Sequence, residues 1–189
     1  YSFVLPIELG ILATDSFSHL DEVARVGNRI GYLFQAQDDF IDVFGDPQLT
    51  GKVGTDIVDG KCTWVTCLAV QLLKDKPALL KEIKAKAPVF KAFRLRGVLR
   101  RPVRPKVPND SHGPITNDCH CFPFQENFGC VKNERRVKEI LAELGIPEIF
   151  TKFEDSFSSD IAEDISRFPI EPLRPLLSDV LAQLTRRKK

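Results

Sequence analysis

Residues 20–44 carry apolar side chains at a helical spacing, and this period constrains the fold more than any other feature of the sequence. Apolar residues that recur every three or four positions lie on one face of an α-helix. The residues that keep this period are Leu20, Val23, Val26, Ile30, Leu33 and Gln37. Gly45, Asp46 and Pro47 follow directly, and such residues end a helix. One long helix is therefore predicted up to Phe44.

The rest of the sequence is also predicted to be helical. No stretch shows the alternation of apolar and polar residues that indicates a β-strand, and no internal repeat is present. Helical periods are predicted for residues 1–14, 61–73, 77–83, 127–144, 148–168 and 176–184. Pro6 is expected to kink the first of these helices, and residues 169–175 are expected to form a connector.

Three aspartates gather at the end of the long predicted helix. At about 100° per residue, one side of this helix carries Gln35, Asp38, Asp39 and Asp42. Crowded carboxylates repel one another unless a cation lies among them, and the negative end of the helix dipole adds to that repulsion. Magnesium takes oxygen ligands and often shares its shell between carboxylates and substrate phosphates. The spacing predicts a magnesium site, and the alternative is a solvated acidic face.

The loop predicted for residues 45–60 is long and rich in glycine. Lys52 lies within it and Lys61 directly follows it. A flexible backbone with mobile ammonium groups suits the binding of phosphate, and long loops of this kind often have a function. Trp64, shortly after the loop, is expected to pack in the core rather than to bind a ligand.

Composition excludes several classes of protein. The formal net charge of +1 gives no support to nucleic acid or membrane binding. No apolar run reaches the roughly 18 residues of a transmembrane helix, and the first residues lack the basic region of a signal peptide. The five scattered cysteines suit a reducing compartment, so a cytoplasmic location is expected. Because methionine is absent, we expect a C-terminal fragment or an incomplete gene model.

Residues 84–125 differ from the rest of the chain. Basic residues run from Lys84 to Lys106 with no acidic residue before Asp110, and many prolines interrupt any helix. A retained intron or gene-model error is the favoured interpretation, a disordered insertion is the second, and a basic arm for RNA or acidic membranes is the weakest. Cys119 and Cys121 lack the spacing of a zinc site.

The segment from Gln35 to Cys62 resembles a known family. Its pattern, QxQDDxxDxFGDPxxTGKxGTDIxxxKC, is similar to the second aspartate-rich region of eukaryotic farnesyl diphosphate synthases, trans-prenyltransferases of the isoprenoid synthase fold. The resemblance extends to residues 1–6 and to residues 127–189, which end in a basic tail. It covers most of this chain but only the C-terminal half of the family's fold.

The resemblance implies a fold and a division of the chain. The expected fold is all-α, the C-terminal portion of the isoprenoid synthase helical bundle. Residues 1–83 would hold the central helices with the aspartate motif and the phosphate-binding loop. Residues 84–125 would be an irregular insert, and residues 126–189 would form the C-terminal helices and the basic tail.

The resemblance also implies the reaction, a condensation of isopentenyl diphosphate with dimethylallyl or geranyl diphosphate. The ligands of Mg²⁺ would be Asp38, Asp39 and Asp42. Lys52 and Lys61 would bind the allylic diphosphate and stabilise the departing pyrophosphate, with Asp56 in support. An apolar pocket would keep water from the carbocation.

Further substrate contacts are implied at both ends of the chain. Tyr1 would line the substrate pocket, although simple core packing is the alternative, and Gln35 would contact substrate beside the aspartates. Arg186 and Arg187 in the basic tail would fold over the homoallylic diphosphate. The alternative for the tail is a favourable interaction with the dipole at a helix end.

One departure from the family limits what this chain is expected to do alone. The family needs two aspartate-rich motifs and this chain contains only the second, so the 189 residues alone are expected to be inactive. The alternatives are a truncated paralogue that dimerises with the full-length enzyme, and a terpene synthase derived from the same scaffold. A homodimer is expected, with neither nucleic acid nor a stable membrane anchor as partner.

One further pair of carboxylates has the spacing for a metal site. Asp160 and Asp164 are one turn apart in the helix predicted for residues 148–168. Several other acidic residues accompany them on that helix, so the pattern favours a solvated acidic face over a second metal site.

Overall fold

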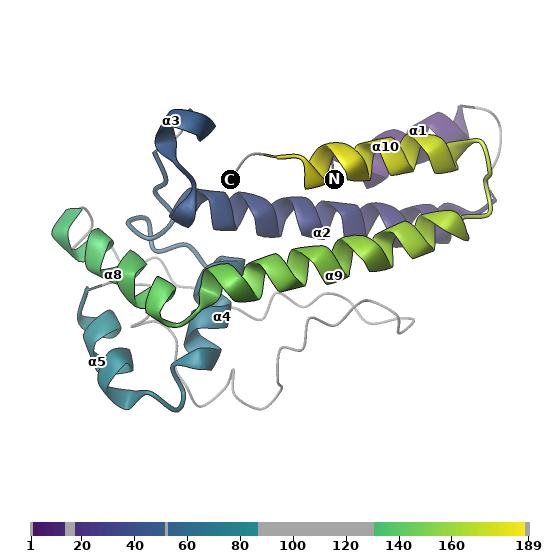
Figure 1. Cartoon of the computed structure of the whole chain (residues 1–189). Helices are drawn as coiled ribbons and strands as arrows, with labels where there is room; N and C mark the ends of the chain where they lie inside the picture. Colours follow the sequence, from purple (N-terminus) through teal and green to yellow (C-terminus); the bar gives the residue numbers. More distant parts are fainter. Residues whose placement is uncertain (1, 14–17, 52, 87–130, 188–189) are drawn as a thin grey trace. The chain divides into compact units, whose positions relative to one another are not determined.

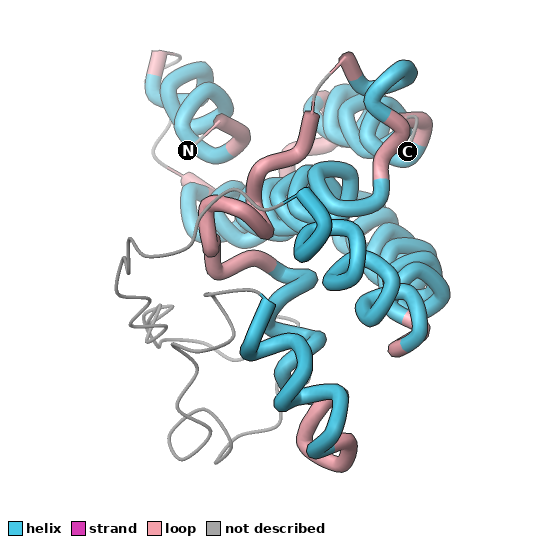
Figure 2. The backbone as a smooth tube through the Cα atoms, turned by 90° about the vertical axis from the view of Figure 1, so that its left-hand side faces the viewer, coloured by secondary structure: helices cyan, strands magenta, loops and turns pink. Residues whose placement is uncertain are grey.

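The computed structural model describes residues 2–13, 18–51, 53–86 and 131–187, and every regular element in these ranges is a helix (Figure 1). Figure 2 shows the same helices, joined by loops and turns. The prediction of an all-α chain is therefore confirmed. Most of the predicted insert, together with Tyr1 and Lys52, lies outside the described residues.

The chain divides into two compact units, which are described separately. The first unit contains Tyr1–Gln37 and Thr151–Lys188. The second unit contains most of Asp38–Lys106 and Asp110–Phe150. The predicted division into residues 1–83, 84–125 and 126–189 is based on sequence order and stays a prediction.

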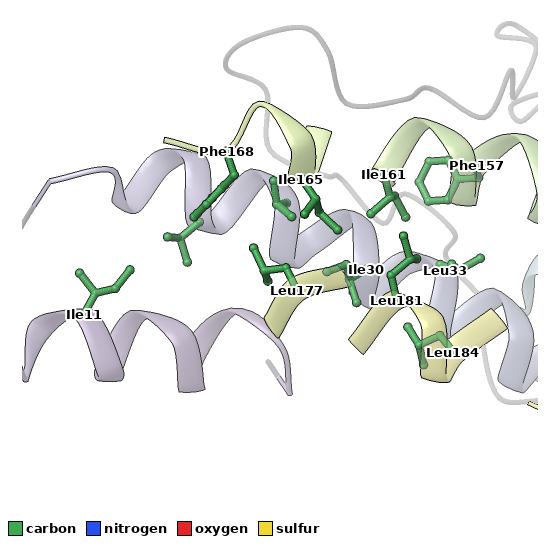
Figure 3. Close-up of a cluster of buried hydrophobic side chains, with 12 residues drawn as sticks. Ile11, Ile30, Leu33, Phe157, Ile161, Ile165, Phe168, Leu177, Leu181 and Leu184 are labelled. Carbon is green, nitrogen blue, oxygen red and sulfur yellow. The ribbon is translucent and has the colours of Figure 1, made fainter. Parts of the chain in front are cut away.

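The first unit is built from α1 (Val4–Leu12), most of α2 (Leu20–Phe44), most of α9 (Ile146–Ser166) and α10 (Leu173–Thr185). Its core joins the apolar faces of these helices, as Figure 3 shows. The buried members are Ile11, Val23, Val26, Ile30, Leu33, Phe157, Ile161, Ile165, Phe168, Leu177, Leu181 and Leu184. The predicted apolar period of α2 is thus the face that enters the core.

Two prolines affect this unit differently from the prediction. Pro6 lies in the first turn of α1, where a backbone N–H has no partner within the helix, so the helix begins at Val4 and loses no internal bond to Pro6. Helix α10 begins at Leu173 rather than at residue 176, because Pro175 also falls in a first turn and is tolerated there. Part of the predicted connector is therefore helical.

The second unit contains α3 (Pro47–Thr50), α4 (Trp64–Leu72), α5 (Pro77–Lys86) and α8 (Val131–Glu143), with the last residues of α2 and the first of α9. Phe40 of α2 stacks on Phe150 of α9 with ring centroids 4.1 Å apart, and Trp64 meets Phe150 edge-on at 5.2 Å. Trp64 therefore packs among aromatic rings, as expected.

Helices α5 and α8 pack against each other in the second unit. Arg136 of α8 joins them, because its Nε donates to Glu82 of α5 at 2.8 Å while its Nη1 reaches Glu143 at 2.8 Å. This pairing lowers the pKa of Glu82 and raises that of Arg136. Residues 84–86, assigned by sequence to the insert, belong to α5 instead.

Candidate metal and phosphate site

The last two turns of α2 and the loop after them form a pocket in the second unit. The pocket is lined by Asp38, Ile41, Asp42, Thr50 and Gly54. Asp38, Ile41 and Asp42 come from α2, Thr50 comes from α3, and Gly54 comes from the loop. Two of the three predicted carboxylates, one helical turn apart, therefore share one pocket with the glycine-rich loop.

Asp42 fastens the loop to the helix. Its Oδ1 accepts a hydrogen bond from the backbone N–H of Asp56 at 2.9 Å, and its Oδ2 accepts one from that of Thr55 at 3.3 Å. Gly54 makes this approach possible, since a Cβ on Gly54 would lie 1.7 Å from the carbonyl oxygen of Asp42. Only a residue without a side chain fits where two backbones approach so closely.

Asp39 is bonded to the first residue of α4. It is 8% exposed, and its Oδ2 accepts a hydrogen bond from the backbone N–H of Trp64, the first residue of α4, at 2.7 Å. A carboxylate at this position satisfies a free N–H and interacts favourably with the positive end of the helix dipole. Asp39 thus helps to begin α4.

The described part of the chain contains no group of three or more His, Cys, Asp or Glu side chains placed to hold a metal ion together. Among the three predicted ligands, Asp38 and Asp42 line the pocket and Asp39 bonds to α4. A complete protein ligand set is thus not assembled, and the assignment of all three aspartates to magnesium stays a prediction.

Lys61 stands at the end of the loop and pairs with Asp56. Its Nζ lies 2.5 Å from Asp56 Oδ1 and 3.8 Å from Asp59 Oδ2. The hydrogen bond to Asp56 raises the pKa of Lys61, so its charge is secure at neutral pH. The ammonium group is exposed and held in place by carboxylates, which suits it to receive a phosphate.

Asp56 has a raised pKa beside the pocket. It is 7% exposed, and burial is the main cause of its raised pKa. The charges of Asp42 and Asp38 raise this pKa further, while the hydrogen bond from Lys61 opposes the shift. A cation near Asp38 and Asp42 would relieve this repulsion.

The described site residues that were predicted in the first unit are Gln35, Arg186 and Arg187. Gln35 is exposed on α2. Arg187 follows α10, where its guanidinium lies 4.6 Å above the Phe34 ring and its Nη1 lies 3.5 Å from Gln37 Oε1. Arg186 is the exposed C-cap of α10. The described start of the basic tail is thus fixed to α2.

Comparison with known proteins shows what this chain is similar to. Residues 1–92 match the family model described as polyprenyl synthetase. A geranylgeranyl pyrophosphate synthase from Schizosaccharomyces pombe is 30% identical over 168 residues, which is 87% of this chain and 36% of that protein. The chain is therefore similar to polyprenyl synthetases. The predicted resemblance to farnesyl diphosphate synthases is also confirmed.

Two curated farnesyl pyrophosphate synthases extend this relationship. Farnesyl pyrophosphate synthase 1 of Lupinus albus is 27% identical over 191 residues, and these cover 100% of this chain and 44% of that protein. The chicken enzyme, from Gallus gallus, is 44% identical over 73 residues, covering 38% of this chain and 20% of that protein. The chain therefore spans less than half the length of these curated polyprenyl synthetase relatives.

The fold has relatives of known structure. The unliganded farnesyl pyrophosphate synthase of T. brucei matches with a TM-score of 0.69 at 18% identity, covering 96% of this chain and 44% of that chain. At this identity the likeness shows the fold, which is the helical isoprenoid synthase fold of the polyprenyl synthetases. None of the described helices combines the length and apolarity that crossing a bilayer requires.

Sequence reasoning missed the roles of Gln37 in the first unit and of Thr63 in the second. Gln37 is buried and donates to Glu154 Oε1 at 2.7 Å and to the Leu184 carbonyl at 3.1 Å, but a glutamine in an apolar period gives little sign of such a role. Thr63 caps α4 through a reciprocal pair of bonds with Thr66. This capping box could not be recognised in the sequence, because a threonine stands where such a motif usually has Glu or Gln.

The second acidic pair is accounted for within the first unit. The side chain of Asp164 is only 17% exposed and forms ion pairs with Arg29 and Arg25. The ion pair with Arg25 has an N–O distance of 2.7 Å. Asp160 is 46% exposed and lies 3.7 Å from Arg29 Nη2. The expectation of a solvated face is therefore wrong for Asp164, because two arginines of α2 face it.

Proposed function

We propose that this chain carries the diphosphate-binding part of a prenyltransferase that joins isopentenyl diphosphate to dimethylallyl or geranyl diphosphate. The observation that supports this most directly is the pocket in which Asp38 and Asp42 face a glycine-rich loop that ends at Lys61. The carboxylates can bind a cation through their oxygens, and the ammonium group of Lys61 at the end of the loop can bind a phosphate. The names of the curated relatives agree with this reaction class.

The donors in the pocket fit magnesium. Magnesium prefers oxygen ligands and is usually held by one or two carboxylates together with substrate phosphates. Asp38 and Asp42 supply two carboxylates, and their charges also raise the pKa of the nearby Asp56, although burial is the main cause of that shift. We assign the magnesium contacts to Asp38 and Asp42, while Asp39, the third predicted ligand, would first have to release the Trp64 N–H.

The loop residues would act on the diphosphate. Bound magnesium would neutralise the charge that develops on the leaving pyrophosphate. Lys61 would add a second positive charge, oriented by its bond to Asp56. Gly54 would keep the loop backbone against α2, so that the ammonium group and the carboxylates stay close. Lys52, outside the described residues, is proposed as the second loop cation.

The residues of the first unit would serve the other substrate. We propose that Arg186 and Arg187 contact the diphosphate of isopentenyl diphosphate, and that Gln35 and Tyr1 contact substrate. Arg186 is exposed, and the guanidinium of Arg187 lies above the Phe34 ring. The contact of Arg187 therefore fixes the point from which the basic tail continues. Dimerisation with another subunit and a cytoplasmic location are further parts of this proposal.

A ligand-binding assay combined with a turnover assay tests the proposal. The 189-residue chain is expected to bind geranyl diphosphate only when magnesium is present. Because it contains one aspartate motif of this kind, it is expected to form no farnesyl diphosphate from added isopentenyl diphosphate. Product formation would contradict the expected inactivity of the chain alone. An absence of magnesium-dependent binding would contradict the proposed function itself.

A further inference from the structure

Two cysteines lie side by side at the point where the phosphate loop meets α4. The Sγ atoms of Cys62 and Cys67 are 3.5 Å apart. Neither is in a disulfide, and both are partly buried. Neither has a part in the proposed reaction, so the pair is a feature of the molecule that the proposed function does not use.

The beginning of α4 holds the two thiols together. Cys62 directly precedes Thr63, the N-cap, and Cys67 lies in the first turns of the helix. The backbone N–H of Cys67 donates to the Thr63 carbonyl at 2.9 Å, and the Thr63 and Thr66 side chains close the cap. These bonds fix the backbone on both sides of the thiols, so their proximity is built into the helix start.

We propose that Cys62 and Cys67 form a reversible disulfide when the protein meets a low-molecular-weight disulfide such as oxidised glutathione. One cysteine thiolate attacks the glutathione disulfide and releases one glutathione. The second cysteine then attacks the mixed disulfide and releases the other. Two protein thiols lose two protons and two electrons, and one oxidised glutathione becomes two reduced glutathione molecules.

The closure that this reaction requires is small. A disulfide bond is about 2.05 Å long, so the sulfurs must approach by roughly 1.5 Å. Rotation of the two cysteine side chains supplies motion of this size. The spacing of five residues also keeps the ring small, so the second attack is intramolecular and rapid compared with the first.

The disulfide would restrain the part of the loop that carries Lys61. Lys61 directly precedes Cys62, and its carbonyl oxygen accepts a hydrogen bond from Thr66 Oγ1 at 3.4 Å. In the reduced protein, this hydrogen bond helps to hold this end of the loop to α4. In the oxidised protein a covalent bond would do so, which makes the mobility of the Lys61 segment depend on redox state.

Peptide mass mapping of the full chain tests the proposal. Trypsin cleaves after Lys61 and Lys74, so both thiols fall in one peptide, residues 62–74. After treatment with oxidised glutathione and alkylation, we expect this peptide to be about 2 Da lighter than its reduced form and to resist alkylation. Dithiothreitol should restore both alkylation sites. Recovery of a doubly alkylated peptide, or of a stable glutathione adduct, would overturn the proposal.

Matched variants assign the disulfide. A chain with Cys119, Cys121 and Cys130 changed to serine retains only the proposed pair. Its peptide 62–74 should still become about 2 Da lighter on oxidation. Cys62→Ser and Cys67→Ser should each keep a glutathione adduct on the remaining thiol. A disulfide that joins either residue to Cys119, Cys121 or Cys130 in the unmodified chain would contradict the assignment.

Hydrogen exchange tests the consequence without any assay of activity. In the oxidised protein, the amides of residues 61–67 should exchange about tenfold more slowly than in the reduced protein, because local opening is restricted. Cys62→Ser treated in the same way should show no slowing. Equal exchange in the two redox states of the unmodified protein would show that the disulfide does not restrain the loop.

Discussion

The two acidic clusters of this chain have the same spacing and opposite surroundings. Asp38 and Asp42 in the second unit, and Asp160 and Asp164 in the first, are each one helical turn apart. Asp42 accepts hydrogen bonds from backbone N–H groups, and further carboxylates lie beside it. Asp164 instead meets two arginines.

The difference favours Asp38 and Asp42 as the proposed cation site. Around Asp164 the negative charge is already balanced, so an added cation would have to compete with Arg25 and Arg29. Around Asp42, burial is the main cause of the raised pKa of Asp56, and the charges of Asp42 and Asp38 raise this pKa further. Helical spacing of carboxylates is therefore ambiguous, and the residues of the facing elements decide between a structural ion pair and a binding site.

Removing Arg29 should have the largest effect on stability. Its side chain is buried, pairs with Asp164 and lies 5.1 Å from the Phe157 ring. Arg29→Met would leave Asp164 short of a partner in a largely buried place, and we expect the free energy of unfolding to fall by about 3 kcal/mol. Urea denaturation gives this value.

Arg167→Met is the matched control for this experiment. Arg167 pairs with Glu163 on the exposed side of α9, so its loss should cost less than about 1 kcal/mol. Equal effects of the two substitutions would contradict the account of Asp164 as a buried, balanced charge.

Gly54→Ala should have the next largest effect, now in the second unit. The added Cβ would collide with the Asp42 carbonyl, so the loop would have to move away from α2. We expect a loss of about 1–3 kcal/mol in unfolding free energy, together with weaker binding of pyrophosphate. Gly10→Ala is the control, because nothing lies within 4 Å of a Cβ there. A tolerated Gly54→Ala would show that the loop does not need its close contact.

Asp39→Ala should have a smaller effect, and it separates two roles of one residue. If Asp39 serves mainly to cap α4, the substitution should lower the unfolding free energy by about 1 kcal/mol. Magnesium-dependent binding of pyrophosphate should then change little. Calorimetry on the same variant measures both, and a large loss of binding with unchanged stability would make Asp39 a ligand after all.

The pH dependence of stability should show the smallest effect. The pKa of Asp56 is raised above its ordinary value of 3.8 in the folded protein, so folding favours its protonated form. Its contribution to stability is present below pH 3.8 and is lost as the pH rises through the folded pKa. Asp56→Asn should remove this fall, which urea denaturation from about pH 4 to pH 7 would show. An unchanged slope would contradict the raised pKa of Asp56 in the folded protein.

The fold was largely predictable because apolar periods are local. The period from Val23 to Leu33 placed α2 correctly, and its face enters the core. The short helix α3 was missed, since one turn capped by Asp46 leaves no period to detect. The early start of α10 was missed because the prolines before it suggested a connector.

The site was less predictable because its geometry depends on distant partners. The pattern of the sequence pointed to Asp38 and Asp42, and both line the pocket. It could not show that Asp39 turns to Trp64, which lies 25 residues later. Nor could it show that Asp164 meets Arg25 and Arg29, because that contact needs the packing of α2 against α9.

The central claim is that the pocket of Asp38 and Asp42 binds a diphosphate through magnesium, and titration calorimetry with inorganic pyrophosphate tests it most directly. The account predicts binding that requires magnesium and weakens at least about tenfold in Asp38→Asn, a loss of about 1.4 kcal/mol. Asp155→Asn, which removes an exposed carboxylate from α9, should bind as the unmodified chain does. Binding that is independent of magnesium, or equal in the two variants, would contradict the claim.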